Sequence, residues 1–453
     1  MRPAYDLVIM GGGAAGSEAA LSVADGGRTS ILLVEAHHFG GTCTNHGCVP
    51  TKALVKSARV AQAMRTANEF GLANVEPRFE WADVLGRANR IRDHMLREGV
   101  TPFTRAGVDV EFPAQAMLVG ERRLEVDGHA IEANAVVLAT GLEPLIPAIP
   151  GLAEAGYLDN ESALELDDLP RRLAVLGGGP IGCEFAQIFA RFGVRVTIIE
   201  AGERLLPPEE PESSEAIREA FEAESIEVRV GAKVTGVVRS GSGRTLEFER
   251  GSSLEVDSIL VAVGRCLDGS WHGLDAAAIN WDEKGIKVDR HLRTNQQWAY
   301  AAGDVTGGLL FTHAASTMGP IAARNALAGG GTEAFEPRIV PRVTFTDPEV
   351  ASVGITEEQA RAAGRDVRIG VAYVRDAEKA QIDGQTIGQV KVVAAADGEL
   401  LGCHIACETA GDMIHQAVAM MTGRVPVGLV AAEMHAYPTL SQLMRSALRE
   451  ASA

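Results

Sequence analysis

Two glycine-rich turns, each between an apolar run and a helical stretch, constrain the fold of this chain more than any other feature. At the first, residues 7–10 lead into Gly11-Gly12-Gly13-Ala14-Ala15-Gly16, and a helical stretch is expected from Ser17. A second apolar run, 31–34, ends in Glu35, 19 residues after the last of these glycines. Such glycines allow a tight turn and a close approach of the backbone to a pyrophosphate, and the acid accepts from a ribose hydroxyl. The pattern therefore predicts a dinucleotide-binding βαβ unit that uses Gly11, Gly13, Gly16 and Glu35.

The second turn repeats this arrangement in the middle of the chain. The run 173–176 precedes Gly177-Gly178-Gly179-Pro180-Ile181-Gly182, and the run 194–199 is followed by Glu200. One such fingerprint is weak evidence, but two, each with its own acid, are strong evidence. We therefore expect a second dinucleotide-binding unit that uses Gly177, Gly179, Gly182 and Glu200.

Length and charge narrow the classes of protein that remain. The 453 residues are too many for one ordinary core, and the formal charge of −18 argues against nucleic-acid binding, which depends on Lys and Arg. The apolar run at residues 5–10 is too short for the core of an export signal or for a membrane span. No other stretch reaches the roughly 18 uninterrupted apolar residues that a span needs. We therefore expect a cytoplasmic enzyme, in which the six cysteines are reduced unless they are catalytic.

The remaining strands predict where the domains end. Apolar runs at 136–141 and 259–264 are each expected to close a dinucleotide-binding domain. From about residue 336 the runs 341–349 and 388–393 alternate like antiparallel strands, and helical stretches follow at 411–421 and 427–433. The last part of the chain is therefore predicted to be an α+β domain without a nucleotide of its own.

Two cysteines follow the first fingerprint in the run Gly40-Gly41-Thr42-Cys43-Thr44-Asn45-His46-Gly47-Cys48-Val49-Pro50-Thr51-Lys52. Pro50 suits the first turn of a helix, so Cys48 is expected at a helix N-terminus, where a thiolate is stabilised. Lys52 lies four residues further on and would share a helix face with Cys48. The residues alone leave open a redox pair, two unpaired buried cysteines or half of a zinc site.

The order of these motifs resembles the pyridine nucleotide–disulfide oxidoreductases, flavoenzymes that include dihydrolipoamide dehydrogenase, glutathione reductase and mercuric reductase. The resemblance extends over essentially all 453 residues. The motifs that carry it are the cysteine run, Tyr300-Ala301-Ala302-Gly303-Asp304-Val305, the segment 345–354 and His435-Ala436-Tyr437-Pro438-Thr439. It implies FAD at the first fingerprint, a nicotinamide nucleotide at the second, and a homodimer with shared active sites. The implied fold is α/β, with an FAD domain at 1–143, an NAD domain at 144–267, a central segment at 268–335 that completes the FAD domain, and an interface domain at 336–453.

The same resemblance implies roles for single residues. Cys48 would exchange electrons with the flavin, Cys43 would react with substrate, and Lys52 would pair with Glu184 beside the flavin. Asp304 would hold the ribityl or phosphate part of FAD. Further cofactor contacts are expected at Thr42, Thr140, Gly141 and Gly264, and no metal site is expected.

The C-terminal run departs from the thiol-reducing members of that family. Their pattern His-x-His-Pro-Thr-x-x-Glu carries a catalytic base and an acid that orients it, but here Tyr437 and Gln442 stand at those two positions. A phenol with a pKa of about 10 is a poor proton shuttle at neutral pH compared with an imidazole at about 6.5. His435 matches the first, non-catalytic histidine, so a structural role is expected for it, with service as the base as the alternative.

The sequence also predicts the nucleotide preference and the roles of the other cysteines. Glu200 favours NADH over NADPH, since it would repel a 2′-phosphate, and Arg204 alone does not form a basic cluster. Cys403 and Cys407, four residues apart in an expected strand, would lie about 13 Å apart, too far for a disulfide. Cys183 is expected to pack in the core, and a structural role is expected for Cys266.

We therefore expect an FAD-dependent NADH–disulfide/dithiol oxidoreductase that resembles dihydrolipoamide dehydrogenase. The alternative is a metal-ion reductase of the mercuric type or a quinone reductase, because the His/Glu pair is replaced by Tyr437 and Gln442. The mercuric route would lack the C-terminal cysteine pair of that type, since the last seven residues are Ala447-Leu448-Arg449-Glu450-Ala451-Ser452-Ala453. A flavoprotein kept as a binding component of a larger complex is a third reading, which the intact Cys43, Cys48, Lys52 and Glu184 disfavour.

Overall fold

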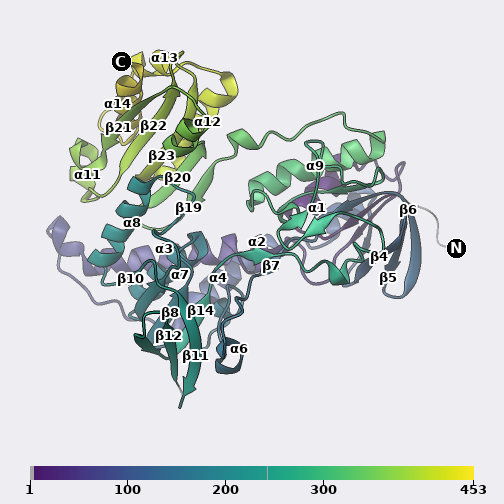
Figure 1. Ribbon diagram of the computed structural model, residues 1–453, viewed down its shortest axis with the longest axis horizontal. Coiled ribbons are helices and arrows are strands. Elements are labelled where there is room, and N and C mark those ends of the chain that lie inside the picture. Colours follow the sequence, from purple (N-terminus) through teal and green to yellow (C-terminus); the bar gives the residue numbers. More distant parts are fainter. Residues whose placement is uncertain (1–4, 242) are drawn as a thin grey trace. The chain divides into compact units, whose positions relative to one another are not determined.

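The computed structural model describes residues 5–241 and 243–453, which form two compact units (Figure 1). The first unit consists of the residues up to Pro50, Gly86–Leu145 and Gly264–Pro337. The second consists of Thr51–Leu85, Ile146–Val263 and Arg338–Ala453. The finer division into four segments stays a prediction.

A seven-stranded sheet in the order β3-β2-β1-β6-β5-β4, with β18 beside β6, forms the centre of the first unit. Its parallel part consists of β1 (Tyr5–Met10), β2 (Ile31–Val34), β3 (Asp109–Glu111), β6 (His129–Leu138) and β18 (Ala299–Ala301). β4 (Ala116–Gly120) and β5 (Arg123–Val126) extend β6 as antiparallel strands. The two predicted strands at the first fingerprint are confirmed, and β2 is buried along its whole length, as expected for a central parallel strand.

Helices α1 (Ala14–Val23) and α9 (Thr312–Ala328) pack on one face of this sheet. They approach so closely that a Cβ on Gly319 of α9 would lie 2.0 Å from the carbonyl oxygen of Ala15. Helix α1 begins three residues before the predicted Ser17, because Gly16 has no side chain to prevent the first turn from closing against the oxygen of Gly11. The fingerprint and α9 are thus held in one packed layer.

Short elements complete the first unit. The cysteine run forms α2 (Gly41–Asn45) and the start of α3 (Cys48–Arg65). Helix α3 continues into the second unit, and α4 (Trp81–Met95) returns from the second unit to the first. The others are α5 (Thr101–Ala106), β7 (Glu143–Pro144), β15 (Arg265–Cys266), η3 (Gly269–Trp271), β16 (Trp281–Asp282), β17 (Gly285–Ile286) and η4 (Asp304–Thr306).

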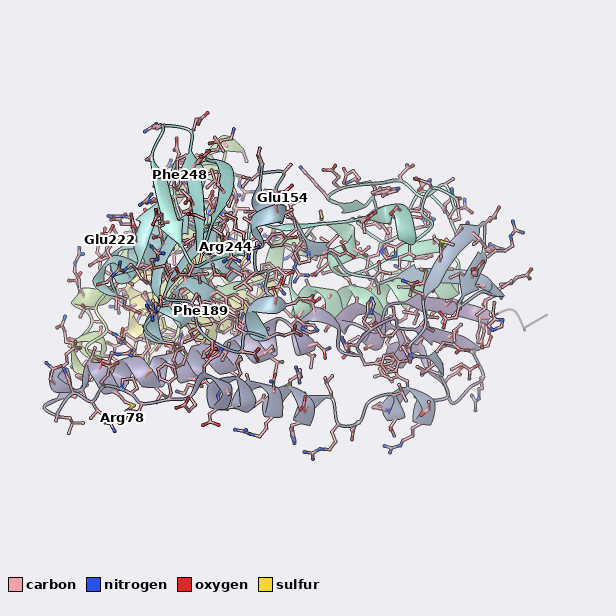
Figure 2. All side chains as sticks on the ribbon, turned by 90° about the horizontal axis from the view of Figure 1, so that it is seen from below. Arg78, Glu154, Phe189, Glu222, Arg244 and Phe248 are labelled. Carbon is pink, nitrogen blue, oxygen red and sulfur yellow. The ribbon has the colours of Figure 1, made fainter. Side chains whose placement is uncertain are left out.

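The second unit contains a parallel sheet of the predicted βαβ type in the order β10-β9-β8-β14. Its strands are β8 (Arg172–Leu176), β9 (Arg195–Ile199), β10 (Glu227–Arg229) and β14 (Ser258–Val261), accompanied by α7 (Pro180–Arg191) and α8 (Pro211–Ala223). Beside them lie η1 (Ala67–Phe70), α6 (Leu152–Ala155), η2 (Ser162–Leu164) and an antiparallel sheet of β11 (Val234–Ser240), β12 (Gly243–Phe248) and β13 (Ser253–Val256). Figure 2 labels Phe189 of α7, whose ring packs against Trp81 of α4 with centroids 6.1 Å apart.

The C-terminal α+β part of the second unit contains a five-stranded antiparallel sheet. Its order is β19 (Arg342–Thr344), β20 (Glu349–Gly354), β23 (Leu400–Cys407), β22 (Gln389–Ala395) and β21 (Val367–Tyr373). The helices of this part are η5 (Pro337–Ile339), α10 (Glu357–Ala362), η6 (Val374–Asp376), α11 (Glu378–Asp383), α12 (Ala410–Gly423), α13 (Val427–Ala432) and α14 (Ser441–Ser452).

The predicted C-terminal strands and helices are present, with two differences. The run expected to be one strand at 341–349 contains the end of β19 at Thr344 and the start of β20 at Glu349, separated by a turn whose Pro348 has no N–H to donate. Strand β22 is buried at every position instead of on alternate residues. No helix of the described residues is long and apolar enough to cross a membrane.

Candidate active site

The first glycine-rich turn has the backbone geometry that its sequence predicts. Gly11 has a φ of +105°, and a Cβ there would lie 2.4 Å from the oxygen of Ala139. A Cβ on Gly16 would lie 1.8 Å from the oxygen of Gly11. Glu35 accepts hydrogen bonds from the N–H groups of Gly12 (2.6 Å) and His37 (2.7 Å), so its carboxylate is fixed at the turn. Only glycine fits these two close approaches.

A cavity of about 140 Å³ opens beside this turn. Gly11, Glu35, Thr140 and Gly141 line it together with Cys266 and His272. The hydroxyl of Thr140 is buried and has no hydrogen-bond partner among the described residues. A buried polar group without a partner indicates a missing ligand or water. The lining therefore fits the nucleotide part of FAD, which would supply an acceptor or donor for that hydroxyl.

Asp304 and Gly264 also belong to the first unit. Asp304 begins the short helix η4, and burial raises the pKa of its carboxyl, while Arg265 opposes the shift. Gly264 has a φ of +138°, and its oxygen accepts from the N–H of Leu145 at 3.0 Å. The sequence grouped Gly264 with cofactor contacts, but the structure shows only that it joins the ends of two segments of this unit.

The cysteine run lies directly against the first fingerprint. The N–H of Gly40 donates to the oxygen of Gly12 at 3.0 Å, and a Cβ on Gly41 would lie 2.9 Å from the Cα of Gly13. This contact puts the next residues, Thr42 and Cys43 of α2, beside the turn that is expected to hold the pyrophosphate. The amide of Asn45, which is buried, donates to the oxygens of Phe39 and Gly41 at 2.9 Å and fixes the short helix.

Cys43 and Cys48 lie on successive helices of this run. Cys48 is the first residue of α3, at the helix N-terminus that was predicted for it. Its side chain is exposed, whereas that of Cys43 in α2 is half-buried. The Sγ of Cys48 lies 3.5 Å from the Oγ1 of Thr312, the first residue of α9. The structure thus brings an exposed sulfur to the N-terminal end of its own helix, where the helix dipole favours an anion.

Lys52 and Glu184, expected to pair, form an ion pair in the second unit. The Nζ of Lys52 lies 2.8 Å from an oxygen of Glu184, whose side chain is only 3% exposed. The other oxygen of Glu184 accepts from the N–H of Phe345 at 2.9 Å, and the ammonium group lies 4.9 Å from the centroid of the Phe345 ring. The position of the ammonium group, one helical turn after Cys48 in α3, is therefore fixed.

The second fingerprint matches the first in detail. Gly177 has a φ of +109°, and a Cβ on Gly182 would lie 2.0 Å from the oxygen of Gly177. A Cβ on Gly179 would meet no atom within 4 Å, so there is open space at the start of α7. Glu200 accepts from the N–H groups of Gly178 (2.7 Å) and Gly202 (2.6 Å). This site fits a second dinucleotide, whose phosphates would lie at the N-terminus of α7.

The C-terminal run carries no base that is oriented by an acid. Tyr437 is 68% exposed, and the amide of Gln442 donates to the oxygen of Ala436 at 3.3 Å. No hydrogen bond joins Tyr437 to Gln442 among the described residues. The Nδ1 of His435 lies 2.8 Å from the oxygen of Ser441, which orients the ring and leaves its role a prediction.

The remaining cysteines are embedded in protein or line the cavity. Cys403 and Cys407 lie in strand β23, both fully buried, and burial raises the pKa of each thiol to about 12. Burial also raises the pKa of Cys183 in α7, and that of the half-buried Cys266. Thiols with a raised pKa form little thiolate at neutral pH. These four cysteines are therefore poor candidates for a second redox centre, and no cluster of metal-binding side chains is found among the described residues.

Sequence reasoning missed two residues that the structure brings to the site. Thr312 lies at the sulfur of Cys48, although 264 residues separate them. Phe345 contacts both members of the Lys52–Glu184 pair. No sequence signal marked Thr312, and Phe345 was marked only as the first residue of the segment 345–354.

Comparisons with known proteins agree with this architecture. The family model of the pyridine nucleotide-disulphide oxidoreductases matches residues 5–319, and that of their dimerisation domain matches residues 340–448. Dihydrolipoyl dehydrogenase from Bacillus subtilis is 35% identical, over 98% of this chain and 97% of its own length. Mercuric reductase from Staphylococcus aureus is 34% identical, over 91% of this chain and 76% of its own length. A solved Cu(II) complex of the HOCl-induced flavoprotein disulfide reductase RclA from Escherichia coli is 28% identical, covers 98% of this chain and 99% of its own, and has a TM-score of 0.87.

Proposed function

The chain belongs to the pyridine nucleotide-disulphide oxidoreductases, and on that premise we propose that it is an NADH-dependent disulfide/dithiol oxidoreductase with Cys43 and Cys48 as its redox pair. FAD and a nicotinamide nucleotide are the cofactors of this family. The observation that carries the proposal is the close packing of Gly41 on Gly13, which sets the cysteine run against the first fingerprint. A dithiol in that place is suited to exchange electrons with a bound flavin.

Cys43 is half-buried in α2, whereas Cys48 is exposed at the start of α3, and this difference supports different roles for the two sulfurs. The thiolate of Cys43 attacks a disulfide of the acceptor, whose S–S bond breaks, and the leaving sulfur takes a proton from solvent. The thiolate of Cys48 then attacks Cys43 in the mixed disulfide, which releases the second acceptor sulfur and forms the Cys43–Cys48 disulfide. When bound, FAD and NADH supply the two electrons that return this disulfide to the dithiol. Lys52, held by Glu184, contributes a cation on the helix that begins with Cys48.

The proposed preference for NADH rests on Glu200. Both of its oxygens accept hydrogen bonds from backbone N–H groups. The carboxylate is therefore held at the end of β9 and cannot turn away from a bound nucleotide. A free 2′-hydroxyl can donate to such a carboxylate, whereas a 2′-phosphate would be repelled. Arg204 does not offset this effect, because its guanidinium donates to the oxygen of Pro207 at 3.0 Å.

The nearest named activity is oxidation of dihydrolipoamide with NAD⁺, and Tyr437 and Gln442 weaken it. A positioned base contributes roughly 10²–10⁴ in rate, and Tyr437 is exposed without an acid to orient it. This observation favours a second candidate, reduction of a metal ion or a quinone, which requires no histidine base. Relatives named mercuric reductase and a relative solved with Cu(II) make Hg²⁺ and Cu²⁺ the ions to assay.

We also propose a homodimer. The match to the family's dimerisation domain over residues 340–448 supports it, and that domain is the antiparallel sheet with its helices. Sedimentation of the FAD-loaded protein should give twice the chain mass of 47.8 kDa, and a monomer at micromolar concentration would contradict this part of the proposal.

Parallel assays of one preparation test the proposed function. The purified protein is offered NAD⁺ with dihydrolipoamide, and NADH with Hg²⁺, Cu²⁺ and a quinone, beside Cys43→Ser as the matched control. We expect turnover with at least one acceptor and its loss in the control. Equal turnover by the control would show that the dithiol is not part of the reaction.

A further inference from the structure

The sulfur of Cys48 and the hydroxyl of Thr312 form a contact for which the proposed function has no role. The two atoms lie 3.5 Å apart, within the range of a hydrogen bond to sulfur. Both residues belong to the first unit, and both begin a helix, Cys48 in α3 and Thr312 in α9. The contact therefore joins the N-terminal ends of two helices at one sulfur atom.

The position of Thr312 is fixed by packing that has nothing to do with the cysteine. Helix α9 lies against α1 so closely that Gly319 has no room for a Cβ. The residues on either side of Thr312 also hold the start of the helix, because the rings of Phe311 and His313 stack with centroids 5.5 Å apart. The hydroxyl is thus presented by a rigid element, and the fingerprint helix α1 sets its place.

The chemistry of the pair depends on the charge of the sulfur. A neutral thiol and a hydroxyl can each donate to the other, but a thiolate can only accept, so the hydroxyl of Thr312 must then donate. A hydrogen bond to an ionised acceptor is about twice as strong as one between neutral groups. We propose that Thr312 is the hydrogen-bond donor that holds the sulfur of Cys48 as a thiolate and so makes Cys48 the leaving group of the redox disulfide.

This inference rests on the proposed roles of the two cysteines and adds a reason for their difference. When a substrate thiolate attacks the disulfide at Cys43, the Cys43–Cys48 bond breaks and its electron pair goes to Cys48. A leaving sulfur with a lower pKa leaves faster. The donor at Thr312, together with the two helix N-termini, therefore directs attack to Cys43.

The test measures the thiol of Cys48 directly, without a substrate. In a Cys43→Ser background, the rate of alkylation by iodoacetamide is followed from pH 4 to pH 10, and peptide mass spectrometry identifies Cys48 as the labelled residue. Two matched pairs isolate the hydroxyl: Thr312 against Thr312→Val, and Thr312→Ser against Thr312→Ala. Bound flavin absorbance and far-ultraviolet circular dichroism show that each variant is folded.

We expect the midpoint of the alkylation profile to rise by about one to two pH units when the hydroxyl is removed. The serine variant should stay close to the parent. Superimposable profiles within either pair would overturn the inference. Because the readout needs neither NADH nor an acceptor, its outcome is separate from that of the turnover assays. A shifted profile, together with no turnover by the protein that retains Cys43, would refute the proposed function and leave the hydrogen bond from Thr312 to Cys48 standing.

Discussion

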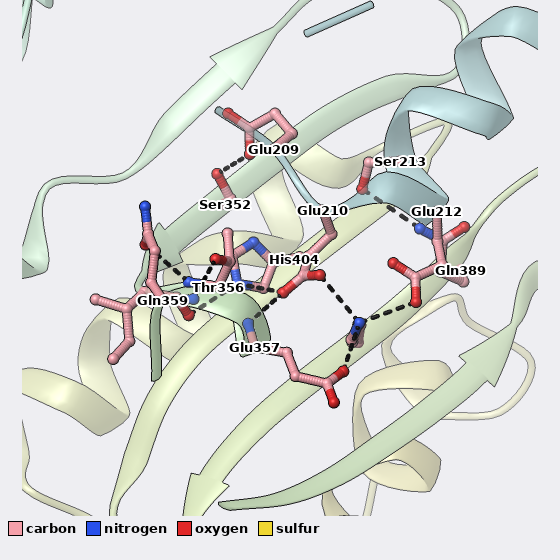
Figure 3. Close-up of polar contacts among 12 residues, drawn as sticks. Glu209, Glu210, Glu212, Ser213, Ser352, Thr356, Glu357, Gln359, Gln389 and His404 are labelled. Carbon is pink, nitrogen blue, oxygen red and sulfur yellow. Dashed lines mark hydrogen bonds and ion pairs between the residues drawn. The ribbon is translucent and has the colours of Figure 1, made fainter. Parts of the chain in front are cut away.

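Replacing Lys391 by methionine should destabilise the second unit strongly. Lys391 is only 4% exposed in strand β22, and its ammonium group lies 3.0 Å from Glu210, 2.9 Å from Glu212 and 2.9 Å from Glu357. Figure 3 shows these three carboxylates converging from the loop before α8, from α8 and from α10. One buried cation therefore holds the segment that follows the second fingerprint strand onto the C-terminal sheet.

The size of the effect follows from the burial of the partners. Removing one member of a buried ion pair costs about 3–5 kcal/mol, because the other charge stays buried without compensation. Glu212 and Glu357 are 41% and 28% exposed and can turn to water, whereas Glu210 is 2% exposed. Glu210 keeps one hydrogen bond, from the N–H of Glu357 at 2.6 Å. We therefore expect a loss near the lower end, about 3 kcal/mol.

The loss should depend on pH in a defined direction. Burial alone would lower the pKa of Lys391, but the hydrogen bonds that its ammonium group donates to Glu212, Glu357 and Glu210 raise it. The hydrogen bond from Lys391 lowers the pKa of Glu357 below its ordinary 4.5. The stabilisation by the lysine is complete below its unfolded pKa of about 10.4, and that by the glutamate is lost as the pH falls below about 4.5. The deficit of the variant should thus be largest between about pH 5 and pH 10 and should shrink towards pH 4.

Urea unfolding, followed by near-ultraviolet circular dichroism at several pH values, measures this deficit. Lys287→Met is the matched control, since Lys287 pairs with Asp282 at 2.6 Å while both side chains are about half exposed. Its expected cost is about 0–1 kcal/mol. Adding Glu210→Gln to Lys391→Met should restore much of the stability. A Lys391→Met variant as stable as the control, or a deficit that grows on acidification, would refute this reasoning.

Two further predictions concern the substrates. Glu200→Ala should lower kcat/KM for NADH by at least about tenfold relative to kcat/KM for NADPH, because a charge-assisted hydrogen bond is worth about 1.5–3 kcal/mol. If steady-state assays give the same ratio of the two kcat/KM values as the parent, Glu200 does not select the nucleotide. Installing the missing acid–base pair with Tyr437→His and Gln442→Glu should raise dihydrolipoamide oxidation by about 10²-fold or more. If the double variant forms NADH from dihydrolipoamide no faster than the parent, the lack of a base is not what limits dihydrolipoamide oxidation.

Local sequence patterns predicted the parts of the site that depend on neighbouring residues. The turns at Gly11 and Gly177 could be predicted because each places strand, glycines and helix within about twenty residues, and backbone sterics leave no alternative to glycine. The helix start at Cys48 was likewise predictable, because Pro50 fits only the first turn.

Contacts between distant segments could not be predicted in this way. Lys391, flanked by valines and a glutamine, has the pattern of an exposed strand position, but every residue of β22 is buried. Its partners come from about 180 residues earlier in the chain, at Glu210 and Glu212. Thr312 is similar, since nothing near it in the sequence indicates a cysteine. Such polar contacts are fixed by tertiary packing, and no local periodicity encodes them.

The central claim is that NADH reduces the Cys43–Cys48 pair, and differential thiol labelling tests it most directly. The oxidised protein is incubated anaerobically with one equivalent of NADH, labelled with iodoacetamide, and then unfolded and labelled with a heavier reagent. We predict that Cys43 and Cys48 take the first label only after NADH is added, while the buried Cys183, Cys403 and Cys407 take only the second. Identical labelling of Cys43 and Cys48 with and without NADH would contradict the claim.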